Sequence, residues 1–180
     1  MLFRSRIPRG PALGLAPVAG ALEVPARQLA AAIAAGVSIL LRPPLDAPTP
    51  ALQIAYLVLD AGWVAAALSV LPVLDEDLDP YLADPRIASV VVTGSPSEAD
   101  RVRRLAWRAR VTVETEGAAA VIVAADADVG QAAERIVGAA LTFQGQGGLR
   151  VGRVVAERPV LDELRERLLA RLEALEMGDP

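Results

Sequence analysis

Apolar runs of strand length alternate with helical patterns along nearly the whole chain of 180 residues, and this alternation constrains the fold more than any other feature. The runs are continuous in apolar residues, as is typical of strands buried on both faces of a sheet. We expect strands at residues 12–18, 37–41, 68–74, 87–93, 111–114, 119–124 and 150–157. The pattern predicts βαβ units, and therefore an α/β fold in which a parallel, Rossmann-like sheet carries helices on both faces.

Capping residues predict where the first helices begin and end. Residues 25–35 are rich in alanine, and Gly36 is expected to close this helix. Thr49 and Pro50 predict an N-cap and a first-turn proline for the next helix, which Gly62 ends.

Later segments differ in how strongly their pattern indicates a helix. Ser95, Pro96 and Glu98 form a capping box at the start of one helix. Residues 75–79 carry four acids and are expected to form an acidic loop. The last helix is predicted from leucines at helical spacing, namely Leu161, Leu164, Leu168, Leu172 and Leu175.

The composition places no sharp domain boundary, and one compact unit is an alternative. If the chain divides, Gly117 is the expected turn, with an αβ domain at residues 1–116 and a second, partial αβ domain at residues 117–180.

Histidine and cysteine, which carry much of enzyme chemistry, are both absent from the chain, and all eighteen basic residues are arginine. These absences exclude a Ser-His-Asp triad, a cysteine nucleophile, a disulfide and a Cys/His zinc site. Any chemistry must use carboxylates, hydroxyls, arginine, backbone amides or a group supplied by another molecule.

Charge and hydropathy argue against two classes of partner. The net charge is -4, arginines are scattered among acids and aromatic residues make up 3% of the chain, so nucleic acid binding is not expected. Residues 51–74 have membrane-spanning length, but Gln53, Asp60, Gly62 and Pro72 interrupt them, so we expect no membrane segment. Prolines also interrupt the arginine-bearing residues 1–22, which favours a cytoplasmic protein over one with a cleaved signal.

Gly94 and Ser95 follow a predicted strand and open a helix, where free amides and the helix dipole favour an anion. The capping box uses some of those amides, and Glu98 adds negative charge. An ordinary capped turn is therefore the favoured interpretation, and an anion site is the alternative.

Glu114 and Glu116 end another predicted strand and could act as an acid and base pair. A solvated strand end is the favoured interpretation. Asp126 and Asp128 are interpreted as helix-capping residues, because nothing near them in sequence completes a metal site.

Residues 144–148 (QGQGG) form a glycine-rich bend that we interpret as a helix-to-strand connection. The run lacks the lysine and hydroxyl of a phosphate-binding loop, so that motif is excluded.

Short motifs recur in a fixed order along the chain: residues 30–36 (AAAIAAG), 40–43 (LLRP), 49–50 (TP), 60–62 (DAG), 84–85 (DP), 92–95 (VTGS), 113–114 (VE) with Gly117, 126–128 (DAD), 145–146 (GQ), 153–155 (RVV) and 178–180 (GDP). In this order they resemble the middle of an NAD(P)-dependent aldehyde dehydrogenase, over residues 11–180. The resemblance implies most of a nucleotide-binding sheet and the start of a catalytic domain.

The resemblance also implies a damaged catalytic site. Gly148 stands where the family's Gly-Gln-x-Cys motif has its nucleophile, and Ala19 stands where Pro-Trp-Asn-Phe-Pro has its oxyanion-holding asparagine. Glu114 matches the family's general base, but its surrounding motif is altered.

The cofactor positions are altered as well. Arg42 stands in place of the family's cofactor lysine, Leu45 in place of its ribose-binding glutamate, and Ala99 in place of a helix glycine. Arg42, Gly94 and Ser95 are the residues that would hold a nucleotide. With these positions altered we expect no cofactor, and weak binding of NAD or NADP is the alternative.

From these substitutions we expect a pseudoenzyme, because covalent catalysis requires the nucleophile. The leading hypothesis is a structural or regulatory subunit that self-associates as a homo-oligomer or binds a true dehydrogenase as its protein partner. A residual NAD(P)-binding protein or weak oxidoreductase is the alternative.

Overall fold

The computed structural model describes residues 7–115, 117–148, 150–176 and 178. The chain divides into two compact units, Met1–Thr115 and Glu116–Pro180, and each is described by itself.

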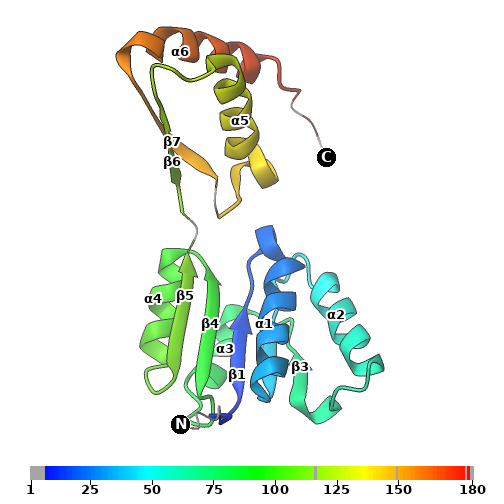
Figure 1. Ribbon diagram of the computed structural model, residues 1–180. Helices are drawn as coiled ribbons and strands as arrows, with labels where there is room; N and C mark the ends of the chain where they lie inside the picture. The colour runs from blue at the N-terminus through cyan, green and yellow to red at the C-terminus, as the bar shows by residue number, and fades with distance from the viewer. Residues whose placement is uncertain (1–6, 116, 149, 177, 179–180) are drawn as a thin grey trace, which may run out of the picture. The chain divides into compact units, whose positions relative to one another are not determined.

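The first unit is built on a five-stranded parallel sheet (Figure 1). Its strands are β1 (Ala12–Leu15), β2 (Ile39–Arg42), β3 (Leu68–Val70), β4 (Ser89–Gly94) and β5 (Arg110–Thr115). They lie in the order β3-β2-β1-β4-β5, so the chain reverses its direction of travel across the sheet between β1 and β4. In sheets of this order, ligands bind at the carboxyl ends of the strands on either side of that reversal. The predicted α/β class with a parallel sheet is confirmed.

Helices cover both faces of this sheet, as predicted. The buried side chains of α1 (Glu23–Ala35) and α2 (Thr49–Asp60) pack with one set of strand residues, and those of α3 (Asp75–Leu82) and α4 (Pro96–Leu105) pack with the other. Short 3-10 turns at η1 (Val18–Gly20) and η2 (Ala65–Ala67) complete the connections.

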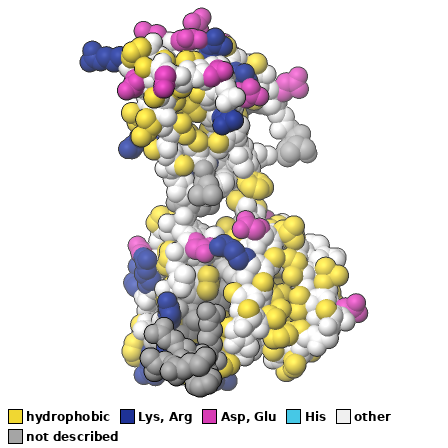
Figure 2. Space-filling model, viewed as in Figure 1, with side chains coloured by type: hydrophobic (Ala, Val, Ile, Leu, Met, Phe, Trp, Pro, Cys, Tyr) yellow, Lys and Arg dark blue, Asp and Glu magenta, His cyan; other side chains and the backbone are white. Residues whose placement is uncertain are grey.

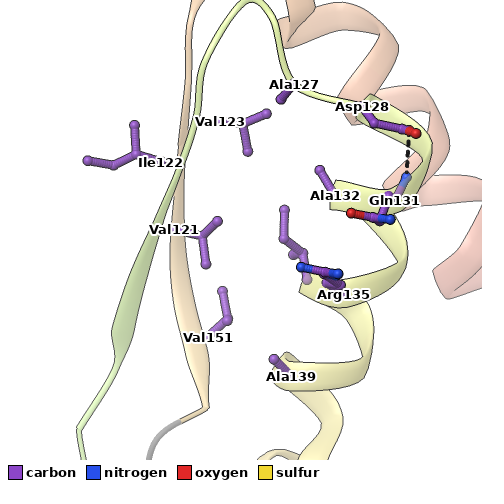
Figure 3. Close-up of a pocket in the computed structure, with 11 residues that line it drawn as sticks. Val121, Ile122, Val123, Ala127, Asp128, Gln131, Ala132, Arg135, Ala139 and Val151 are labelled. Atoms are coloured by element: carbon purple, nitrogen blue, oxygen red, sulfur yellow. Dashed lines mark hydrogen bonds between the residues drawn. The ribbon is translucent and has the colours of Figure 1, made fainter.

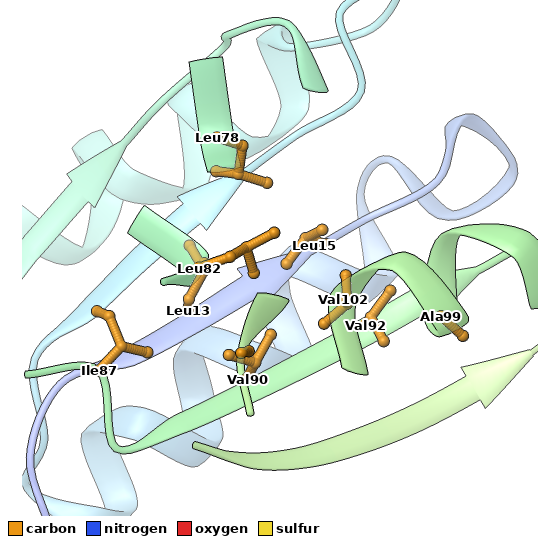
Figure 4. Close-up of a cluster of buried hydrophobic side chains, with 10 residues drawn as sticks. Leu13, Leu15, Leu78, Leu82, Ile87, Val90, Val92, Ala99 and Val102 are labelled. Carbon is orange, nitrogen blue, oxygen red and sulfur yellow. The ribbon is translucent and has the colours of Figure 1, made fainter. Parts of the chain in front are cut away.

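The larger core lies under α3 and α4 (Figure 4). Leu13 and Leu15 of β1 stand beside Val90 and Val92 of β4 in register, and all four are almost fully buried. Burying each such side chain stabilises the fold by roughly 1.5–3 kcal/mol. Alternation along a strand sends Ala12 to the opposite face, into the core under α1 and α2.

Residues 75–79 are not the expected acidic loop, and that prediction is wrong. They begin α3, with Asp75, Glu76 and Asp77 in its first turn, where the helix dipole favours negative charge. Leu78 and Leu82, one turn apart, are buried and fix the helix on the sheet.

Of three predicted helix caps, two are confirmed and one is wrong. Thr49 was the expected N-cap of α2, but it is already helical, and Pro48 is the N-cap without a side-chain hydrogen bond. Gly36 closes α1 as predicted, in the left-handed conformation with φ 67°. Ser95 caps α4 as predicted, and its Oγ accepts a hydrogen bond of 3.2 Å from the backbone N–H of Glu98.

The second unit pairs β6 (Ala119–Val123) with β7 (Val151–Ala156) in a parallel ladder. Helices α5 (Val129–Leu141) and α6 (Arg158–Glu173) bury one face of this pair, and a 3-10 turn, η3 (Thr142–Gly145), follows α5. Ile122 and Val155 are 78% and 51% exposed.

The capping and leucine predictions for the second unit hold in part. Asp128 caps α5 by accepting a hydrogen bond of 2.9 Å from the N–H of Gln131. Leu164 is buried in α6, whereas Leu161 and Leu172 are 46% and 45% exposed. Within the described ranges, no helix is both long enough and apolar enough to span a membrane.

Candidate functional site

The three predicted cofactor-binding residues lie at the carboxyl ends of the strands in the first unit. Arg42 is the last residue of β2, Gly94 is the last residue of β4, and Ser95 is the N-cap of α4. Because β2 and β4 flank β1 in a parallel sheet, all three residues belong to the same edge.

Arg42 is already paired within the chain. Its Nη2 donates to a carboxylate oxygen of Asp75, the first residue of α3, and forms an ion pair with it. The Arg42 side chain is only 12% exposed. Its Nε is buried and has no hydrogen-bond partner among the described residues.

Arg101 makes a second link at this edge, between α4 and α3. Its Nη2 donates to the backbone oxygen of Asp75 and to a carboxylate oxygen of Asp79. Its Nη1 is buried and likewise lacks a partner within the described part of the chain. The sequence pattern indicated neither Arg101 nor Asp75 as a site residue.

Glu98 closes the space above Gly94. A Cβ atom built on Gly94 would lie 2.2 Å from Oε2 of Glu98, so the carboxylate rests directly against this glycine. Burial raises the pKa of the Glu98 carboxyl, and the negative charge of Asp75 raises it further, while Arg42 and Arg101 oppose that rise.

A dinucleotide phosphate at this edge would compete with carboxylates of the chain itself. It would need the amides beside Gly94 and the positive charges of Arg42 and Arg101. The carboxylate of Glu98 covers the glycine, and Asp75 and Asp79 neutralise the two arginines.

Glu114, in the general-base position implied by the resemblance, is held by two partners. Nη1 and Nη2 of Arg27 in α1 donate to its two carboxylate oxygens at 2.9 and 2.5 Å. Oγ1 of Thr93 donates to the same carboxylate at 3.0 Å. Chiefly through the Arg27 hydrogen bond, the pKa of Glu114 lies below its ordinary value, although burial opposes the shift.

Arg27 was not predicted to be a site residue, because its partner lies 87 residues away in the sequence. Glu116, the other member of the expected carboxylate pair, lies outside the described residues.

A cavity of about 250 Å³ adjoins the Arg27–Glu114 pair between α1 and strands β1 and β4. Gln28 lines it and is buried, with Nε2 donating to the backbone oxygen of Leu15 at 3.1 Å.

Gly148 lies in the second unit, after η3. It is exposed, and its backbone oxygen accepts a hydrogen bond of 3.0 Å from Gly117. A Cβ atom at Gly148 would meet nothing within 4 Å, so the backbone there has room for a side chain. Ala19, the expected oxyanion position, lies in η1 of the first unit.

The second unit has a cavity of its own, of about 390 Å³, between β6 and α5 (Figure 3). Val121 and Val123 point toward the helix, and Ile122 points away from it. Asp128, Gln131 and Arg135 supply its polar lining. None of the predicted site residues lines this cavity.

Comparison with known proteins places these observations in a family. The model of the aldehyde dehydrogenase family matches residues 1–180. A (Z)-2-((N-methylformamido)methylene)-5-hydroxybutyrolactone dehydrogenase of Acinetobacter baylyi is 30% identical, over 97% of this chain and 36% of its own length. A 1-pyrroline-5-carboxylate dehydrogenase of Anoxybacillus flavithermus is also 30% identical, over the same shares of both chains.

Solved structures agree with the sequence relatives. A 1-pyrroline-5-carboxylate dehydrogenase from Thermus with bound NAD superposes with a TM-score of 0.88 at 28% identity, over 95% of this chain and 35% of that one. A 3,6-anhydro-L-galactose dehydrogenase in complex with NAP gives a TM-score of 0.89 at 28% identity, over 97% and 37%. The chain thus spans about 36% of the length of the curated relatives it matches. Because the family model matches the whole chain and the solved relatives share its fold, this protein belongs to the aldehyde dehydrogenase family.

Proposed function

We propose that this chain is a catalytically inactive member of the aldehyde dehydrogenase family. In this proposal it acts as a structural or regulatory subunit, either by self-association or by binding a true dehydrogenase.

The observation that carries the proposal is the pairing of Glu114. A general base works best with a pKa near the operating pH, and its carboxylate must be able to reach the reacting group. Arg27 binds both oxygens of Glu114 and lowers its pKa, which opposes that role. The chain also has no cysteine for a base to activate, and Gly148 offers no side chain in its place.

Exposed apolar side chains support a role in association. Tyr56 and Leu57 of α2 are 69% and 68% exposed, and hydrophobic side chains gather over this helix in Figure 2. Ile122 of β6 adds an exposed apolar side chain in the second unit. Contiguous apolar patches on a protein surface commonly mark interaction sites.

Two measurements test the proposal. The purified chain, incubated with NAD or NADP and a panel of aldehydes, should produce no absorbance of reduced nicotinamide; turnover would contradict the inactive role. Sedimentation of the chain, alone and mixed with a full-length aldehyde dehydrogenase, should reveal a homo-oligomer or a mixed complex. A monomer under both conditions would contradict the subunit role.

A residual nucleotide-binding protein or weak oxidoreductase is the second candidate. The buried, unpartnered N–H groups of Arg42 and Arg101 favour it, because an anion could accept hydrogen bonds from them. Titration calorimetry with NAD and NADP separates the candidates, since heat of binding at millimolar ligand is expected only for the second.

A further inference from the structure

Five charged residues at the carboxyl edge of the first unit form one connected group: Arg42, Asp75, Asp79, Glu98 and Arg101. We call this group the edge cluster. Its members come from β2, α3 and α4, and both of its arginines bind carboxylates of α3.

The features that commonly bind an anion lie within or next to the edge cluster. The N-terminus of α4 begins immediately after β4, and such ends bind phosphate through free amides and the helix dipole. Arg42 and Arg101 add two positive charges, each with one buried N–H that has no partner among the described residues.

The chain's own carboxylates take the place that an external anion would use. Asp75 pairs with Arg42, and its backbone oxygen together with Asp79 binds Arg101. The carboxylate of Glu98 lies against Gly94, at the point where a phosphate would have to approach the backbone.

We propose that Asp75 and Glu98 act as built-in anions that close this edge of the sheet, so that the chain excludes ligands carrying a diphosphate group. Removing the charge of Asp75 frees Arg42, and truncating Glu98 uncovers Gly94, so that either change leaves Arg42, Arg101 and the start of α4 able to bind a diphosphate. This inference does not depend on the proposed subunit role, because it concerns only the side chains of the edge cluster.

Binding measurements on the full chain test the inference. ADP and inorganic pyrophosphate are titrated by calorimetry into the wild type, Glu98→Ala, Asp75→Asn and the double variant. We expect no heat for the wild type at millimolar ligand. Each single variant should bind ADP, and the double variant should bind about tenfold more tightly than either, which corresponds to roughly 1.4 kcal/mol.

Matched variants control for net charge. Glu76→Gln removes one charge from the first turn of α3, and Asp100→Asn removes one from α4, where Asp100 pairs with Arg103 rather than with the edge cluster. Both should behave like the wild type. An equal gain in affinity for ADP in these controls would show that the effect depends only on net charge, and it would overturn the inference.

Two further outcomes would also overturn it. One is wild-type binding of ADP as tight as that of the variants. The other is no binding by any variant that still unfolds cooperatively on heating. If one substitution prevents folding, the other single variant decides. Amide resonances of Gly94 and Ser95 provide a second readout, since pyrophosphate should shift them in Glu98→Ala and leave them unmoved in the wild type.

Discussion

Individual side chains decide what the carboxyl edge of the first unit can do. Glu114 and Glu98 are both partly buried carboxylates, yet their pKa values shift in opposite directions. Arg27 donates two hydrogen bonds to Glu114 and lowers its pKa, whereas burial beside Asp75 raises that of Glu98. The same residue type is therefore a firmly ionised structural group at one position and a more readily protonated one at the other.

The Arg27–Glu114 pair predicts a specific pH dependence of stability. Because the pKa of Glu114 is lower in the folded protein, the pair stabilises the fold above the unfolded-state pKa of about 4.3. That contribution is lost as the pH falls through the still lower folded-state pKa. Since Glu114 is 38% exposed, the contribution should be only about 0.5–1 kcal/mol.

Glu114→Gln should therefore lose about this much unfolding free energy at neutral pH and less in acid. The unfolding free energy is measured by urea unfolding, monitored through the fluorescence of Trp63 and Trp107, which both lie in the first unit. Glu23→Gln is the control, because Glu23 contacts Arg27 only at 3.7 Å and is exposed. An unchanged pH dependence in Glu114→Gln would contradict the assignment.

Gly148 gives a second prediction at the scale of the residue. Gly148→Cys should leave stability within about 0.5 kcal/mol of the wild type, because a Cβ there has open space. The new thiol, the only one in the chain, should react readily with a disulfide reagent. No aldehyde-dependent reduction of NAD should follow, because Glu114 remains paired with Arg27.

Gly14→Ala is the contrasting variant. A Cβ at Gly14 would lie 2.3 Å from Oε1 of the buried Gln28 and 3.1 Å from Leu41, so overpacking should cost about 1–3 kcal/mol.

Aldehyde turnover by Gly148→Cys would contradict the prediction for that variant, because it would show that the missing nucleophile is the only catalytic defect.

At the scale of the element, sequence predicted the strands better than the helix that closes the site. Residues 87–93 have the continuous apolar character typical of a strand buried on two faces, and β4 (Ser89–Gly94) overlaps most of this range. The start of α3 did not read as a helix because its acids mask the two leucines, Leu78 and Leu82, that attach it to the sheet. The local composition of this segment is typical of a loop, and the segment is helical because its leucines pack on β1 and β4.

The cap of α5 can be tested with a matched pair of aspartates. Asp128 accepts a hydrogen bond from Gln131, while Asp126 is exposed two residues earlier. Asp128→Ala should destabilise the second unit by about 1 kcal/mol, and Asp126→Ala by less than about 0.5 kcal/mol. Hydrogen exchange of the α5 backbone amides measures both. Equal effects would contradict the assignment of Asp128 as the cap.

At the scale of the whole molecule, the stability of the first unit depends on the core under α3 and α4. Leu13→Ala should cost about 2–5 kcal/mol, because Leu13 is fully buried and touches both the sheet and this core. The urea midpoint of Leu13→Ala, measured by tryptophan fluorescence, should fall accordingly. Leu57→Ala, on the exposed side of α2, should change it by less than about 0.5 kcal/mol.

A reduced oligomeric state of Leu57→Ala, at unchanged stability, would identify α2 as part of an association surface. If Leu57→Ala destabilises the first unit as much as Leu13→Ala does, the interpretation of α2 as an exposed face is wrong.

The sequence by itself determined the fold class, the family and the absence of a cysteine nucleophile. These properties reside in local patterns, in collinear motifs and in composition, none of which requires knowledge of distant contacts. The tertiary structure alone decided that Arg27 binds Glu114 and that Asp75, Glu98 and Arg42 meet at one edge. Those partners lie on separate elements, and only the parallel sheet, by aligning the carboxyl ends of its strands, brings them together.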